Sequence, residues 1–155
     1  MSEVSRSKPG ELPWATVDIE RVEDLQDAVY GAGLESTQYT RGALTGTLAV
    51  TEYRDTVFTV ANFGGRVGLR GPLSQDRITL AIGLCMPEGS RQWMREVRTR
   101  DIGAFMPNDD HDGLHASGAA YVTMALSRAT LEEIAEDMDV VLDDDAVDTS
   151  GIRGR

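Results

Sequence analysis

Apolar and polar residues alternate through most of the middle of the chain, with the two-residue period of a β-strand. Glycine, proline and aspartate turn signals separate the alternating stretches. This pattern predicts strands at residues 39–53, 56–63, 66–69, 78–85, 92–98, 102–106 and 119–126. Many short strands joined by turns at this spacing are typical of a β-sandwich or a barrel.

Stretches of helical period flank the strands. Asp18 can cap a helix from Ile19 to Tyr30, which Gly31 would end. Near the other end, Thr130 and Glu133 fit a capping box, and we expect a helix to start there. We expect its apolar stripe to pack on the barrel; presentation to a partner subunit is the alternative. The stripe is Leu131, Ile134, Ala135, Met138, Val141 and Leu142.

The predicted fold class is therefore mainly β with flanking helices, and a small jelly-roll barrel is the architecture that we expect. A chain of 155 residues fits one domain. Residues 1–17 contain prolines and a glycine and predict a flexible N-terminal arm. Residues 18–142 are expected to form the domain, and residues 143–155 an acidic, frayed tail.

Charge is distributed unevenly along the chain. The net charge is −11, from 26 acidic and 15 basic residues, and residues 131–148 hold nine acids without a lysine or arginine. This balance does not favour direct nucleic-acid binding, which usually needs a basic patch. No apolar run approaches the ~20 residues that cross a bilayer. The polar start lacks a signal-peptide core. We therefore expect a cytoplasmic protein that does not contact a membrane.

Few residues suggest catalysis. His111 and His115 are the only histidines, in or beside the turn-rich stretch 108–113, where we expect a solvated loop. A loose metal site there, with Asp109 or Asp112, is the alternative. The single cysteine, Cys85, is expected to be a buried core residue. Because no nucleophile elbow, phosphate loop or dinucleotide fingerprint is present, we expect no catalytic residue, no metal and no cofactor.

A ligand pocket requires only an apolar wall with a few polar groups. The aromatic residues of the β region supply candidates, and we select Trp14, Phe58, Trp93 and Tyr121 as ligand-binding residues. Trp14 follows the stretch of the arm that contains the prolines and the glycine, which suggests that it covers the barrel mouth. Trp93 and Met94 are adjacent in a predicted strand, so they should face opposite sides of it.

Three segments together resemble one family. Residues Gln38 to Leu48 (QYTRGALTGTL), Gly103 to Pro107 and Tyr121 to Ser127 resemble the layout of the N-terminal domain of AraC-type transcription regulators. That resemblance implies a cupin-like jelly-roll barrel that binds a small effector and often dimerises. Regulators of this type also carry a C-terminal pair of helix-turn-helix motifs. Nothing in this chain supplies a recognition helix, so the DNA-binding role does not carry over.

The expected function is that of a non-catalytic sensor domain that binds a small-molecule effector. Its readout would pass through a homodimer or a partner protein. Two alternatives belong to other classes. One is a small cupin enzyme, an isomerase or a lyase. The other is a module whose only output is oligomerisation.

Overall fold

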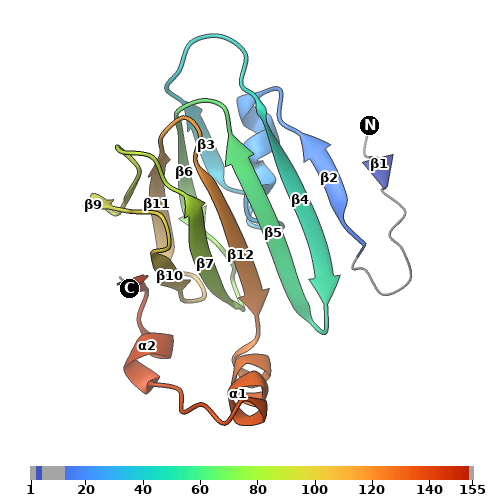
Figure 1. Cartoon of the computed structure of the whole chain (residues 1–155), viewed down its shortest axis with the longest axis vertical. Helices are drawn as coiled ribbons and strands as arrows, with labels where there is room; N and C mark the ends of the chain where they lie inside the picture. Colours follow the sequence, from blue (N-terminus) through green and yellow to red (C-terminus); the bar gives the residue numbers. More distant parts are fainter. Residues whose placement is uncertain (1–2, 5–12, 154–155) are drawn as a thin grey trace.

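Two antiparallel β-sheets make up most of the molecule (Figure 1). The computed structural model describes residues 3–4 and 13–153. The larger sheet runs in the order β1 (Glu3–Val4), β2 (Ala15–Asp18), β4 (Gly46–Tyr53), β5 (Thr56–Phe63), β12 (Ala120–Leu126), β7 (Ile78–Cys85), β10 (Ile102–Phe105) and β13 (Gly151–Arg153). The smaller sheet runs in the order β3 (Glu35–Gln38), β6 (Val67–Pro72), β11 (Asp110–His115), β8 (Arg91–Gln92) and β9 (Arg95–Glu96).

Successive strands cross from one sheet to the other, as in a jelly roll. The chain passes from β5 to β6, β7 and β8, and again from β10 to β11 and β12, changing sheet at each step. Inward-facing side chains from both layers meet in one apolar core, which includes Phe63, Leu69, Phe105 and Tyr121. The predicted class, mainly β with few helices and a jelly-roll-like arrangement, is confirmed.

The N-terminal helix prediction is wrong in type and position. Ala15–Asp18 is a strand paired with β4, and only Val22–Asp27 is helical, as the short 3-10 helix η1. The Asp24 carboxylate accepts hydrogen bonds from the backbone N–H groups of Glu20 and Arg21, at 2.9 Å each. These bonds lower the pKa of Asp24. They fix the chain at the start of η1, and Leu25 within this helix is fully buried.

The stretch 39–53 is not one strand. Gln38 ends β3, and its side-chain amide donates to the carbonyls of Thr40 at 2.7 Å and Gly42 at 2.8 Å, which holds a loop together. Strand β4 begins at Gly46, whose φ is 141°. A Cβ at Gly46 would lie 2.1 Å from the carbonyl oxygen of Asn62. Only glycine therefore fits where the two strands meet.

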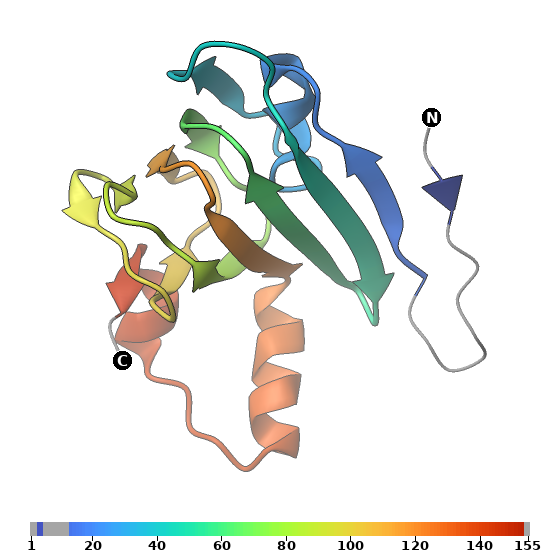
Figure 2. The same cartoon turned by 45° about the horizontal axis from the view of Figure 1, so that its top comes forward.

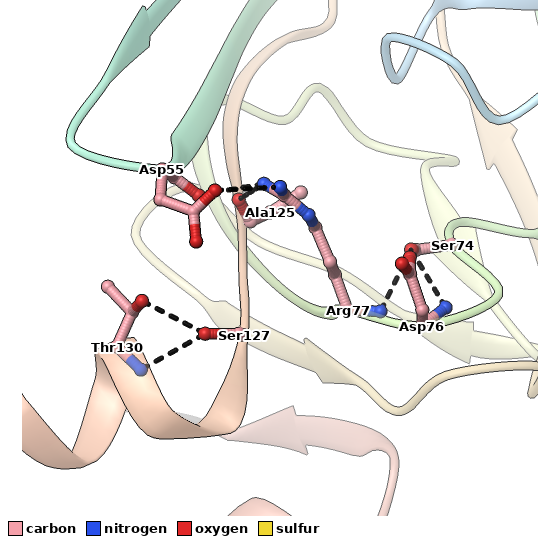
Figure 3. Close-up of polar contacts among 7 residues, drawn as sticks. All are labelled: Asp55, Ser74, Asp76, Arg77, Ala125, Ser127 and Thr130. Carbon is pink, nitrogen blue, oxygen red and sulfur yellow. Dashed lines mark hydrogen bonds and ion pairs between the residues drawn. The ribbon is translucent and has the colours of Figure 1, made fainter.

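The C-terminal helix α1 spans Arg128–Asp137, and its cap is Ser127 rather than Thr130. The Ser127 hydroxyl oxygen accepts from the backbone N–H of Thr130 at 3.1 Å (Figure 3). An extended residue directly before the first turn is the usual N-cap geometry, and Ser127 has it, with φ −69° and ψ 155°. The cap predicted from the sequence, Thr130, is therefore three residues too far along the chain.

The apolar stripe of α1 packs only in part. Leu131 contacts a small cluster of Ile78, Ala104 and Met106, and Ala135 is buried. Leu142 is half-buried, but the other members of the stripe are exposed: the exposed fractions of Ile134, Met138 and Val141 are 42%, 67% and 94%. The helix itself ends at Asp137, before the last three stripe residues. Figure 2 shows α1 projecting below the sheets.

Residues 143–153 are ordered, contrary to the predicted frayed tail. They form helix α2 (Asp144–Asp148) and strand β13, which pairs with β10. The Ser150 hydroxyl accepts from the N–H of Met106 at 2.7 Å and donates to the Asp109 carboxylate at 2.6 Å. The predicted N-terminal arm falls largely on residues outside the described ranges. Its described parts are residues 3–4 and 13–17, in which Glu3 pairs with Thr16 and Val4 with Ala15.

Arg77 ties three segments together at the lower end of the larger sheet (Figure 3). Its guanidinium donates to the carbonyl oxygens of Asp55 at 2.7 Å and Ala125 at 3.3 Å, and it forms an ion pair with the Asp55 carboxylate at 3.1 Å. Ser74 fixes the preceding turn by accepting from the N–H groups of Asp76 and Arg77. In the described ranges, no helix is both long and apolar enough to span a membrane.

Candidate functional site: a polar cavity between the sheets

Strand β11 carries two buried polar residues of the candidate site, His111 and His115. The sequence suggested a solvated loop at 108–113, but Asp110–His115 pairs with β6 on one edge and β8 on the other. Alternation places His111, Gly113 and His115 toward the core and leaves Asp110 and Asp112 exposed. Hydrogen bonds to two neighbouring strands outweigh the weak intrinsic β-propensity of aspartate and glycine. The loop prediction was therefore wrong, because pairing decided this segment.

A cavity of about 60 Å³ lies between the two sheets next to these histidines. Most of its wall is apolar, contributed by residues such as Leu69, Phe105 and Ile152. Five of its side chains are polar and uncharged, and they come from three strands: Gln92, His111, His115, Tyr121 and Thr123. The charged residues of the wall are Arg91 and Asp101, which are of opposite sign.

Four of these side chains have polar atoms without a hydrogen-bond partner among the described residues. Their exposed fractions are only 5% for Gln92, 6% for His111, 7% for His115 and 2% for Thr123. The atoms are Nε2 of Gln92, Nδ1 of His111, both ring nitrogens of His115 and Oγ1 of Thr123. A buried polar group left unpaired costs about 1–3 kcal/mol. Such a concentration of unpaired groups around one cavity is typical of a binding site rather than a core.

Both imidazoles are neutral at physiological pH. Burial lowers the pKa of His111 to about 4, and a hydrogen bond with the backbone of Leu69 offsets this only in part. Burial also lowers the pKa of His115 to about 3, with a smaller contribution from His111. A neutral imidazole donates from one nitrogen and accepts at the other. The cavity therefore offers both donors and acceptors without bringing a net charge.

Tyr121 holds the back of the cavity in place. Its hydroxyl donates a 2.6 Å hydrogen bond to the carbonyl of Ala28, after η1, and burial raises the pKa of the phenol. Its ring lies 5.4 Å from that of His115 and 5.7 Å from that of Phe63, centroid to centroid. Because the hydroxyl already has a partner, Tyr121 offers a ligand its ring face rather than a hydrogen bond.

The four predicted ligand-binding residues do not come together. Tyr121 lines the cavity. Trp93 lies near it but outside, with its ring 5.3 Å from that of Phe105 and its Nε1 donating to the Asp110 carbonyl at 2.8 Å. Phe58 and Trp14 are half-buried and are not part of the cavity wall.

The strand predicted at 92–98 is in fact a hairpin. Trp93 and Met94 form the turn between β8 and β9, with φ values of 47° and 69°. They therefore do not face opposite sides of a strand, as adjacent residues of a strand would. Consecutive positive φ values are typical of the tight hairpin turns that match strand twist. The turn leaves Gln92, directly before it, buried at the cavity.

Sequence reasoning missed Gln92, His111, His115 and Thr123 as site residues. A signal for the two histidines was present in the run from Asp110 to His115. The two aspartates occupy even positions and the two histidines odd positions, so in a strand the histidines would share the face opposite to the acids. Its glycine and aspartates suggested a turn instead. Cys85, predicted to be buried, is exposed at the end of β7. Within the described ranges, no three histidine, cysteine or acidic side chains gather as metal ligands would.

Comparison with known proteins gives one structural likeness. The AraC-like transcriptional activator CuxR superposes with a TM-score of 0.49 at 10% sequence identity, over 68% of this chain and 43% of that protein. The matched part thus spans less than half the length of CuxR. No protein-family model matches the sequence, and no curated protein matches it.

Proposed function

We propose that this chain is a non-catalytic regulatory domain, and that it binds a small, uncharged polar molecule in the cavity between the sheets. One observation carries the proposal: the unpaired polar atoms of Gln92, His111, His115 and Thr123 surround a single cavity. A ligand with hydroxyl or amide groups would satisfy these atoms and remove the cost of leaving them unpaired. The AraC-type pattern in the sequence supports the regulatory role.

The electrostatics of the wall favour an uncharged ligand. The two imidazoles, the amide and the hydroxyl are uncharged, and the charges of Arg91 and Asp101 in the wall are of opposite sign, so the wall carries no formal net charge to offset the hydration that an ion would lose on entry. The volume of the cavity limits the size of the ligand. Since each water-sized group needs roughly 10–15 Å³ of such space, the cavity of about 60 Å³ suits roughly four to six heavy atoms. A short polyol or a small amide meets both requirements.

The cavity wall also connects the ligand to segments that could transmit a signal. Ile152 of β13 lines the cavity, and its carbonyl oxygen accepts a 3.1 Å hydrogen bond from Arg95 in β9. Gln92 of β8 lines the cavity as well. A ligand that contacts Ile152 and Gln92 would favour one arrangement of the C-terminal segment and the β8–β9 hairpin. We propose that a second copy or a partner protein in the cytoplasm reads this change, without DNA contact by this chain.

A thermal-shift screen with small uncharged polyols, sugars and amides tests the proposal. A ligand at 100 times its dissociation constant adds about 2.7 kcal/mol, which raises Tm by roughly 5–10 °C for a domain of this size. The response should disappear in Thr123→Val, which removes the hydroxyl at nearly constant volume.

Thr79→Val is the matched control. Thr79 is as buried as Thr123 and its hydroxyl is also unpaired, but it does not line the cavity. The control should keep the full ligand response. Equal loss in the two variants, or the absence of any shift across the screen, would contradict the proposal.

A further inference from the structure

The outer face of the smaller sheet carries a groove of about 250 Å³, whose lining overlaps that of the inner cavity at Arg91. Three arginines line it, Arg66, Arg70 and Arg91, together with the single acid Asp112. Its apolar members include Tyr39, Met94 and Leu114. A formal excess of positive charge is unusual on a chain whose net charge is −11.

Strand geometry brings the arginines around one floor. Arg66 lies just before β6, and Gly68 and Arg70 follow at two-residue spacing, while the intervening Val67 and Leu69 are buried. With a rise of about 3.3 Å per residue, Arg66 and Arg70 stand about 13 Å apart on either side of Gly68. Their long side chains reach toward the space above it.

The third arginine faces that space from two strands away. Gly68 is opposite Leu114, and Leu114 is opposite Arg91. Because neighbouring strands are about 4.8 Å apart, Arg91 lies about 10 Å from Gly68 across the sheet. The three arginines thus line the groove around backbone positions Gly68 and Leu114.

Acidic neighbours neutralise this cluster only in part. Asp112 lies 3.9 Å from Nε of Arg70, but both side chains are more than half exposed, so the pair is weak. Glu35 and Glu96 are opposite Arg70 and Arg91 in the strand register. Neither glutamate forms an ion pair with these arginines. Within the described ranges, Arg66 and Arg91 form no ion pair with any acidic side chain.

Exposed apolar surface adjoins the charges. The ring of Tyr39 lies over the backbone of Gly68, where an added Cβ would be 3.0 Å from its Cε2 atom. The exposed fractions of Tyr39 and Met94 are 61% and 84%. A flat ring and a polarizable thioether beside guanidinium groups suit a ligand that combines an anion with a flat, partly apolar group.

We propose that this groove binds an organic phosphate of the nucleoside monophosphate class. Arg66, Arg70 and Arg91 would hold the phosphate, since guanidinium groups pair bidentately with phosphate oxygens. Tyr39 and Met94 would contact the base. The groove and the cavity share Arg91, whereas Arg66 and Arg70 line the groove and not the cavity. Arg66→Gln and Arg70→Gln therefore test this site separately from the proposed effector site.

Isothermal titration calorimetry of the full chain at low salt tests this site with four probes: adenosine monophosphate, guanosine monophosphate, ribose 5-phosphate and inorganic phosphate. We expect a nucleoside monophosphate to bind more tightly than the two probes that lack a base. Arg66→Gln, Arg70→Gln and Arg91→Gln should each weaken binding about tenfold or more, because each removes a charge-assisted hydrogen bond. Asp112→Asn should tighten binding.

Arg98→Gln is the charge-matched control, since Arg98 is exposed and lies outside the groove. It should leave the dissociation constant within twofold. The proposal is overturned if no probe binds at millimolar concentration, if Arg98→Gln weakens binding as much as the groove variants, or if ribose 5-phosphate binds as tightly as the nucleotides. Tighter binding of a single-stranded oligonucleotide than of a mononucleotide would also overturn it, by indicating a nucleic-acid surface.

Discussion

The ring of His111 lies against Gly113, two residues further along β11. A Cβ at Gly113 would be 2.9 Å from Cε1 and Nε2 of that ring and 3.0 Å from Oε1 of Gln92. Glycine at this position therefore keeps room for two polar side chains that face the cavity. Gly68 lies in the neighbouring strand β6. A Cβ at Gly68 would meet the ring of Tyr39 on the outer face of the sheet, and not the side chains of the cavity.

Gly113→Ala should consequently abolish effector binding while the domain stays folded. The atoms it would meet are ends of side chains that can move aside, so we expect a change in unfolding free energy below about 1.5 kcal/mol. Thermal shifts with a compound identified in the screen measure the binding loss, and urea denaturation measures stability. Gly68→Ala should retain the effector response. A Gly113→Ala protein that binds the compound normally would place its ligand elsewhere.

The two buried histidines should make stability depend on pH between 7 and 5. In the unfolded chain they bind protons with a pKa near 6.5, but in the folded protein burial lowers the pKa of His111 to about 4 and that of His115 to about 3. The unfolded state therefore binds more protons, and the free energy of unfolding falls as pH decreases through this window. Each histidine contributes about 1 kcal/mol between pH 6 and pH 5.

Urea denaturation at pH 5, 6, 7 and 8 measures this effect. His115→Phe should remove about half of the decrease that the two histidines cause. Above pH 7 both states are neutral at these positions, so wild type and variant should then differ by a constant amount. The same slope in both proteins between pH 6 and 5 would show that His115 is not held neutral.

Tyr121→Phe should destabilise the domain, although it keeps an aromatic ring in the cavity wall. The variant leaves the fully buried backbone of Ala28 without its 2.6 Å hydrogen bond from the phenol. We expect a loss of about 1–3 kcal/mol, which lowers Tm by roughly 3–10 °C. Tyr53→Phe is the control, because Tyr53 is 48% exposed. Similar melting temperatures for the two variants would mean that the bond to Ala28 contributes little.

Ser127→Ala should weaken α1. Loss of an N-cap side chain costs about 1 kcal/mol, and the Ser127 hydroxyl accepts from the N–H of Thr130. Chemical denaturation compares this variant with Ser117→Ala, an exposed serine outside the helices. Thr130→Ala should cost less than Ser127→Ala, because Ser127 is the cap; the reverse order would support the cap predicted from the sequence.

The alternation of apolar residues was sufficient to predict a mainly β domain. In β12, for example, Tyr121, Thr123 and Ala125 face inward while the residues between them are half-buried. Each such strand has the same two-residue period, and glycine and proline turns separate the strands, so the pattern is local and can be read from the sequence. Tyr121 was selected as a site candidate because it is an aromatic residue of the predicted β region, and it lines the cavity.

The sequence by itself did not determine the polar cavity. His111 and His115 lie in a segment whose aspartates and glycine favour a turn, and this segment is a strand because β6 and β8 pair with both of its edges. Gln92 and Thr123 come from β8 in one sheet and β12 in the other, and only the packing of the two sheets brings them to the same cavity. Local propensity determined most of the elements, whereas long-range strand pairing decided which polar groups were buried together.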